Sequence, residues 1–196
     1  IRARISEWGT YAVLMFDLQF KDIKDPSILQ QVQELASRQI LTVTEDGKFE
    51  PERKITHAEM IRMLVEIYGR IQGAESEESE DALSAAVKIG LIADSRKFHP
   101  NSPVSREETA VLIARLLELV SIRLPETGAL PKFKDEKDIS DAAKAAVANA
   151  IRSGIMQGSK PDQFKPKTPV SRAEAAVILL QLLKQLEQLA EDGYEN

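Results

Sequence analysis

The stretch "FHPNSPVSREE" (residues 98–108) recurs almost unchanged as "FKPKTPVSRAE" (164–174), and "FEPERKITHAE" (49–59) shares its skeleton. In each copy a proline follows the phenylalanine after two residues, a serine or threonine after seven, and a glutamate after ten. Agreement at matched offsets in three copies indicates an internal repeat. Such a repeat predicts an array of similar units that share one core, because one unit cannot bury its own apolar face.

Each copy ends in a capping box, the pattern Ser/Thr-x-x-Glu that marks the start of a helix. The hydroxyl accepts a hydrogen bond from a backbone N–H of the first turn, and the glutamate reaches back to the N–H of the capping residue. A helix is therefore expected directly after each box. The capping residues are Thr56, Glu59, Ser105, Glu108, Ser171 and Glu174.

Apolar residues recur with helical period after each box. The three stripes are Met60, Met63, Leu64, Ile67 and Ile71; Val111, Ala114, Leu117 and Val120; and Ala176, Leu179, Leu180, Leu183 and Leu186. Shorter amphipathic helices are predicted before them, at about 27–40, 80–92 and 139–155. Each unit is thus a helix, a loop and a capped helix, and the predicted fold class is all-α.

One segment departs from the helical pattern. Residues 7–18, "EWGTYAVLMFDL", combine aromatic and β-branched side chains and predict a short β-strand. We expect this strand to end a preceding β-domain or to lie against the helices. The expected organisation is a strand or linker at 1–19, units at 20–72, 73–124 and 125–188, and a tail at 189–196.

Composition excludes several classes of function. A net charge of −5 argues against a nucleic-acid partner, and the absence of cysteine excludes thiolate chemistry. No apolar run reaches the ~18 residues of a membrane span, so no membrane insertion is expected. Neither His57 nor His99 has metal-ligand spacing, and no phosphate loop or nucleophile elbow is present. We therefore expect a non-catalytic protein without a cofactor, and Ile1 indicates a processed chain or a fragment.

Two copies place an arginine, Arg106 or Arg172, directly after the capping residue, where the first copy has His57. A cation is unfavourable at a helix N-terminus by about 0.3–1 kcal/mol, so these positions need an explanation. Unpaired N–H groups beside a guanidinium are suited to bind a carboxylate. The structural alternative is that both arginines pair with nearby acids, such as Glu107.

These motifs together resemble the S-layer homology (SLH) repeat of bacterial surface proteins, whose best-known core is the tetrad Thr-Arg-Ala-Glu. The chain has "THAE", "SREE" and "SRAE" in that place. "FKDIKD" (20–25) and "FKDEKD" (133–138) resemble the Phe-x-Asp opening of such repeats. The second unit lacks a clear opening of this kind. The resemblance extends over about residues 20–186.

The resemblance implies three tandem SLH repeats in a pseudo-threefold arrangement, with the capped helices as a central bundle, at the C-terminal end of an exported protein. Its location would be the cell wall or S-layer of a Gram-positive cell. The implied partner is secondary cell-wall polysaccharide, bound through the carboxylate of a pyruvylated amino sugar (pyruvylated ManNAc). Other S-layer protein subunits are further implied partners.

The resemblance also implies where the ligand binds, namely in grooves between neighbouring repeats. The implied ligand contacts are Arg106, Arg172, His57, Gly158, Gln163, Asp46 and Gly47. The groove at His57 is expected to bind weakly or differently, because histidine is shorter than arginine and lacks its permanent charge. Two other interpretations stay open: a helical protein–protein or self-assembly scaffold without carbohydrate affinity, and direct binding to peptidoglycan.

Overall fold

The structure, a computed structural model, describes residues 20–41, 47–73, 81–93, 99–124 and 131–192, with side chains up to residue 189. Within these ranges the chain is helical, and its extended pairing consists of isolated bridges. The all-α prediction is confirmed. The strand predicted at 7–18 lies outside the described residues.

The capped helices begin where the boxes predict, directly after Thr56, Ser105 and Ser171. The shorter helices lie at their predicted positions but are briefer. The first begins at Pro26, one residue before its predicted range, and the third is split. The elements are α1 (Pro26–Ser37), α2 (His57–Gln72), α3 (Ala82–Lys88), α4 (Arg106–Leu119), η2 (Glu136–Asp138), η3 (Asp141–Ala143), α5 (Lys144–Arg152) and α6 (Arg172–Asp192). We call the parts with α1 and α2, α3 and α4, and α5 and α6 the first, second and third unit.

Local hydrogen bonds explain why the capped helices start at these residues. In α2 and α4 the hydroxyl and the glutamate of the box bond in both directions. In α6 the N–H of Glu174 donates to the Ser171 hydroxyl at 3.2 Å. These bonds satisfy N–H groups that a helix start otherwise leaves without an acceptor.

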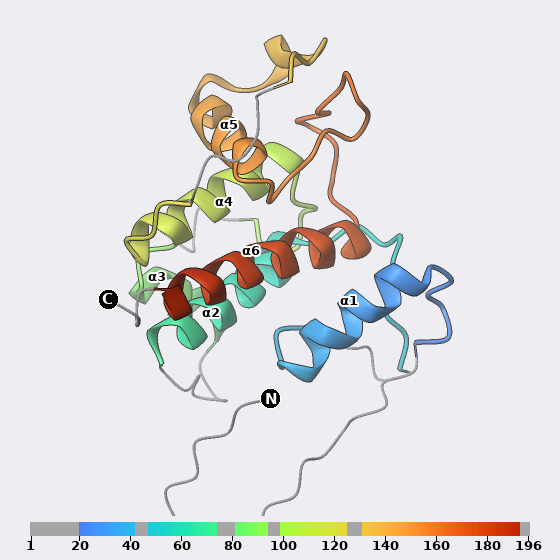
Figure 1. The fold of residues 1–196 in the computed structure, drawn as a ribbon, viewed down its shortest axis with the longest axis vertical. Helices are drawn as coiled ribbons and strands as arrows, with labels where there is room; N and C mark the ends of the chain where they lie inside the picture. Colours follow the sequence, from blue (N-terminus) through green and yellow to red (C-terminus); the bar gives the residue numbers. More distant parts are fainter. Residues whose placement is uncertain (1–19, 42–46, 74–80, 94–98, 125–130, 193–196) are drawn as a thin grey trace, which may run out of the picture.

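The first helix of every unit packs on the capped helix of a different unit. Helix α3 lies on α2, α5 lies on α4, and α1 lies on α6, which joins the two ends of the described chain (Figure 1). Helix α2 also contacts both α4 and α6. Helices α4 and α6 make no such contact in the described part of the chain, so the capped helices are not equally close to one another.

A closed ring of backbone hydrogen bonds holds the three helix starts together. Ile55 N–H donates to the Val170 carbonyl at 3.0 Å, and Val170 N–H donates to the Val104 carbonyl at 2.9 Å. Val104 N–H completes the ring by donating to the Ile55 carbonyl at 3.0 Å. All three residues are buried, and each lies directly before a capping residue. The ring therefore brings positions of three distant loops to one point.

The repeated phenylalanine is buried in the core, next to an aspartate that accepts hydrogen bonds from the loop of that phenylalanine. Phe49 is fully buried, and its ring centre lies 6.0 Å from that of Phe20. The Asp22 carboxylate accepts hydrogen bonds from the N–H groups of Phe49, at 3.1 Å, and Glu50, at 2.6 Å. Glu50 has a φ of 58°, which is unfavourable for a residue with a Cβ, and these bonds compensate for the strain.

The third unit repeats this arrangement. Phe164 and Phe133 have ring centres 5.8 Å apart, and Asp135 accepts from the N–H groups of Phe164 and Lys165 at 3.0 and 2.7 Å. Lys165 also has a φ of 58°. The Phe-x-Asp opening of a unit thus docks onto its own Phe-x-Pro loop.

The predicted apolar stripe is wrong for α4. Its buried face carries Ala110, Ile113 and Leu116, whereas the predicted Val111 and Ala114 are only partly buried. Helix α4 has apolar residues on two faces, and periodicity alone does not show which one meets the core. The stripes of α2 and α6 agree with the prediction, apart from Ile71, which is partly buried.

Candidate functional site

The Arg106 side chain spans the contact between the second and third units. Its Nε donates to the Phe164 carbonyl at 2.7 Å, and its terminal nitrogens donate to the Gln157 carbonyl and the Glu174 carboxylate. The guanidinium carbon lies 4.7 Å from the centre of the Phe164 ring, a cation–π contact. The side chain is only 5% exposed, so Arg106 acts here as a buried link between units.

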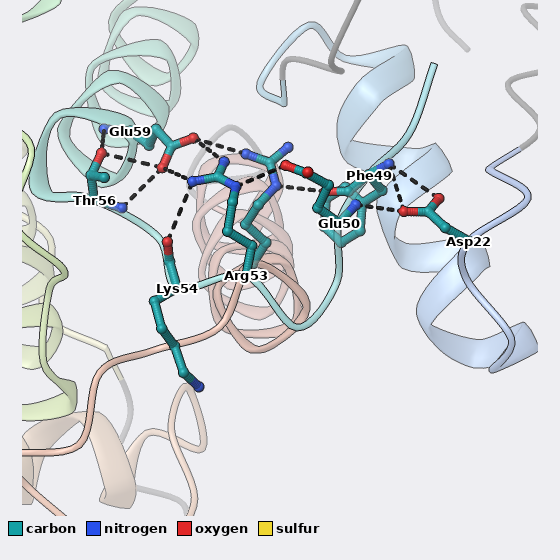
Figure 2. A network of polar contacts seen from close by, with 8 residues as sticks. Asp22, Phe49, Glu50, Arg53, Lys54, Thr56 and Glu59 are labelled. Atoms are coloured by element: carbon teal, nitrogen blue, oxygen red, sulfur yellow. Dashed lines mark hydrogen bonds and ion pairs between the residues drawn. The ribbon is translucent and has the colours of Figure 1, made fainter. Parts of the chain in front are cut away.

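Arg172 makes the corresponding contacts from the third unit to the first. Its Nε donates to the Phe49 carbonyl at 2.7 Å, and a terminal nitrogen pairs with the Glu59 carboxylate at 3.0 Å. The guanidinium carbon lies 4.9 Å from the Phe49 ring centre. Figure 2 shows Glu59 between Thr56, whose helix cap it closes, and Arg53, which donates to the same carboxylate.

His57 occupies the equivalent position between the first and second units with weaker contacts. Its Nδ1–H donates to the Ser102 carbonyl at 2.9 Å. Its Nε2 lies 3.6 Å from a carboxylate oxygen of Glu108, too far for a good hydrogen bond. In all three places the residue after the cap lies beside the capping-box glutamate of the next unit, with the first unit counted as next after the third.

The first-turn N–H groups of the capped helices are not free. In α4, Arg106 N–H donates to the Thr168 carbonyl at 3.1 Å and Glu107 N–H donates to the Pro166 carbonyl at 3.0 Å. The first two N–H groups of α2 and α6 likewise bind loop carbonyls of another unit, those of Ser102, Pro100, Arg53 and Pro51. The expected anion site of unpaired N–H groups is therefore wrong, because carbonyl groups of neighbouring loops already accept hydrogen bonds from these N–H groups.

Burial changes the protonation chemistry of these links. Loss of solvation lowers the pKa of Arg106 to about 10 and also lowers the pKa of Arg172, yet both arginines stay charged at neutral pH. Burial alone would raise the pKa of Glu59, but hydrogen bonds from Arg53 and the Thr56 N–H lower it overall. Each buried cation is thus matched by a carboxylate, as the cost of burying a charge requires.

Glu107 makes a separate link between units and is not the partner of Arg106. Its carboxylate accepts from the Ser140 N–H at 3.0 Å and from the Ser140 hydroxyl at 2.7 Å, and it pairs with Lys167. Burial would raise the pKa of Glu107, but the bonds from Lys167 and Ser140 lower it. The alternative explanation from the sequence was that both arginines pair with acids. It is correct about the pairing, but Arg106 pairs with Glu174 and not with Glu107.

The loop residues expected at the ligand site lie beside Arg106. Gly158 and Gln163 belong to a turn flanked by Gln157 and Phe164, whose carbonyls bind Arg106. A Cβ on Gly158 would lie 2.5 Å from the Lys160 carbonyl oxygen, so only glycine fits this turn.

The corresponding loop of the first unit is described only in part. Gly47 is exposed and has a φ of 74°, which favours glycine. Asp46 lies outside the described residues. Gly47 comes two residues before Phe49, whose carbonyl binds Arg172, so the two arginines meet equivalent loops.

A groove of about 550 Å³ lies where α4 faces η3 and α5, and we call it the α4–α5 groove. His57, Glu107, Glu108 and Ser140 lie along it, and neither Arg106 nor Arg172 lines it. Its helical walls are formed by Val111, Leu112, Ala114, Arg115, Glu118, Ala142, Ala143, Ala145, Ala146 and Asn149. The sequence signal for this groove was the second set of apolar residues on α4, which includes Val111 and Ala114.

Residues 19–61 and 132–176 match the S-layer homology (SLH) domain. Both SLH segments run from before a Phe-x-Asp opening into a capped helix, and so contain the buried phenylalanines and Asp22 or Asp135. They cover parts of the first and third units. The assignment of the second unit as a further SLH repeat stays a prediction, although its capped helix joins the same ring.

The chain is also similar to parts of longer proteins. It is 33% identical over 189 residues to an amylopullulanase of Thermoanaerobacterium thermosulfurigenes, covering 91% of this chain and 10% of that protein. It is 34% identical over 187 residues to the exoglucanase XynX of Acetivibrio thermocellus, covering 90% and 17%. An S-layer protein of Bacillus thuringiensis subsp. finitimus is 26% identical over 167 residues, covering 80% and 20%.

The chain therefore spans between a tenth and a fifth of the length of these relatives. The SLH domain is a non-catalytic anchoring module, and the enzyme names belong to proteins that extend far beyond the matched region. The SLH match and the S-layer relatives indicate an exported protein attached to the cell wall at the bacterial surface. Among the described helices, none has the length and apolar character needed to cross a membrane.

Proposed function

We propose that this chain is a wall-anchoring module that binds secondary cell-wall polysaccharide and so holds a surface protein on the cell. The observation that carries the proposal is the SLH match over both 19–61 and 132–176. Its relatives include an amylopullulanase and an S-layer protein, and the chain matches 10% and 20% of their lengths. The same attachment would serve either kind of protein.

The proposed ligand group is the carboxylate of a pyruvylated amino sugar, with Arg106 and Arg172 as its cationic contacts. Both guanidiniums already bind carboxylates, so a ligand would have to compete with Glu174 and Glu59. Gly158, Gln163, Gly47 and Asp46 would lie along the approach to these arginines. The place at His57 would bind more weakly, because an imidazole lacks the fork of donors that grips a carboxylate.

Sedimentation of the chain with purified cell walls tests this function. We expect binding to intact walls, loss of binding to walls stripped of polysaccharide, and strong weakening when mild acid removes the pyruvate ketal. Binding to stripped walls would instead identify peptidoglycan as the ligand. A folded chain that binds no wall preparation would contradict the anchoring function.

Variants of the two arginines need a folding control, because both side chains are buried between units. Arg106→Lys and Arg172→Lys keep the charge but lose the paired donors. Binding should be compared at a temperature where circular dichroism shows each variant to be folded. Weakened binding by folded variants would support the arginine contacts, and unchanged binding by both would remove them from the site.

A further inference from the structure

The three junctions between units are built from equivalent positions. At each one, the residue after the cap of one unit lies beside the capping-box glutamate of the next unit. We name the junctions after that residue: the His57, Arg106 and Arg172 junctions. The α4–α5 groove lies at the His57 junction, because its lining includes His57, Glu107 and Glu108.

The His57 junction differs from the other two at two positions. The other junctions have an arginine after the cap, and this one has a histidine. They have an alanine directly before the glutamate, Ala173 or Ala58, and this one has Glu107. Both differences act in the same direction, because the first removes a permanent positive charge and the second adds a carboxylate.

The Glu107 carboxylate is fixed in place where α4 begins. Its side chain is 9% exposed, accepts from the Ser140 N–H at 3.0 Å and from the Ser140 hydroxyl at 2.7 Å, and pairs with Lys167. These donors lower the pKa of Glu107, although burial alone would raise it, so the group is negative at neutral pH. An alanine at the equivalent position offers only a methyl group.

The other charges of the groove do not supply a cation for a carboxylate. The titratable lining residues are His57, Glu107, Glu108, Arg115 and Glu118. Lys167 offsets Glu107, and Arg115 offsets Glu118, three residues further along the same helix face. Glu108 stays in excess: its side chain is 52% exposed, and the facing imidazole, at 3.6 Å, lacks a permanent charge. At the other two junctions an arginine balances the corresponding glutamate.

A ligand carboxylate in the α4–α5 groove would therefore meet two protein carboxylates and no guanidinium beside them. Like charges brought together oppose binding, and an unfavourable contact with the wrong ligand is a common basis of specificity. We propose that Glu107 and His57 exclude carboxylate-bearing sugar units from this groove, so that the chain binds them only at the Arg106 and Arg172 junctions. This inference rests on the proposed function and deepens it, because it assigns two specificity-determining residues.

Calorimetry of the full chain with a methyl glycoside of pyruvylated ManNAc tests the exclusion by counting sites. We expect the wild type to bind one glycoside at each arginine junction, two in all. His57→Arg/Glu107→Ala gives the third junction the residues of the other two. It should add a third site whose affinity is within about tenfold of theirs.

His99→Arg/Glu136→Ala is the matched control. It makes the same two exchanges at exposed positions that do not line the groove, so the net charge changes equally. The number of sites should stay at that of the wild type. A third site in this control would overturn the inference, because net charge alone would then explain the gain.

His57→Arg alone separates the two residues. Its third site should be at least about tenfold weaker than that of the double variant, because the Glu107 carboxylate remains. A third site of equal strength would overturn the role of Glu107. His57→Arg/Glu107→Gln removes the charge while keeping an acceptor for Ser140, and it should gain the third site even if the alanine variant does not fold.

Three glycosides bound per wild-type chain would overturn the exclusion. The same holds if the double variants gain no site when circular dichroism shows them to be folded. No binding of the glycoside by the wild type would overturn both the exclusion and the arginine contacts. Sedimentation with intact cell walls would still test the anchoring function separately, so the two failures can be told apart.

Discussion

Arg172 binds Glu59 across 113 positions of sequence, with the two side-chain atoms 3.0 Å apart. The same glutamate closes the cap of α2 and accepts from Arg53. One carboxylate therefore stabilises a local helix start and joins the third unit to the first. Arg106 and Glu174 make the equivalent contact between the second and third units.

Arg172→Ala should destabilise the fold by on the order of 3 kcal/mol, because removing one partner of a buried pair leaves the other uncompensated. Urea denaturation followed by circular dichroism measures this loss. Arg53→Ala is the matched control: it removes a 35% exposed partner of the same Glu59 and should cost about 1 kcal/mol or less. Equal losses in the two variants would contradict a buried link at Arg172.

His57→Arg should stabilise the chain by about 1 kcal/mol, because an arginine reaches Glu108 with charge-assisted hydrogen bonds that the imidazole lacks at 3.6 Å. The midpoint of thermal unfolding at pH 7 should therefore rise. His99→Arg, at an exposed loop position, adds the same side chain outside the link and should leave the midpoint unchanged. A lower midpoint for His57→Arg would show that this site has no room for the link.

Stability should fall with acid partly through Glu107. Its folded-state pKa is depressed below the ordinary value of 4.5, so the folded state binds a proton less readily than the unfolded state. Its contribution is therefore complete above about pH 4.5 and is lost as the pH falls through the folded-state value.

Urea denaturation between pH 7 and pH 3 measures the acid dependence. Glu107→Gln should lower stability at pH 7 and flatten the decline with acid, because the glutamine carries no titrating charge. Glu118→Gln, at an exposed position of α4, should leave the profile unchanged. A profile of Glu107→Gln parallel to that of the wild type would contradict the assignment.

Gly158→Ala should destabilise the third unit by about 1–3 kcal/mol, because its Cβ would lie 2.5 Å from the Lys160 carbonyl and 2.8 Å from the Phe133 ring. Ser159→Ala, at the next exposed position, is the control and should change stability little. Calorimetric melting compares the two. A wild-type melting temperature for Gly158→Ala would mean that the turn relaxes freely.

The helix starts and the all-α class could be predicted from the sequence alone. Capping boxes act over three residues, and apolar stripes act over a few turns, so both are readable from neighbours in sequence. This is why α2, α4 and α6 begin directly after Thr56, Ser105 and Ser171. The SLH resemblance arose from the same local motifs, and the match over 19–61 and 132–176 agrees with it.

The contacts that the motifs make could not be predicted from the sequence, because they depend on how distant segments pack together. The acceptors of Arg106 and Arg172 lie 51 to 123 positions away, and no local spacing predicts them. The same holds for the loop carbonyls that occupy the helix starts, and for the face of α4 that opens into the groove. Hydrogen-bond donors and apolar faces are properties of sequence, but their partners depend on which segments the closed ring of loops brings together.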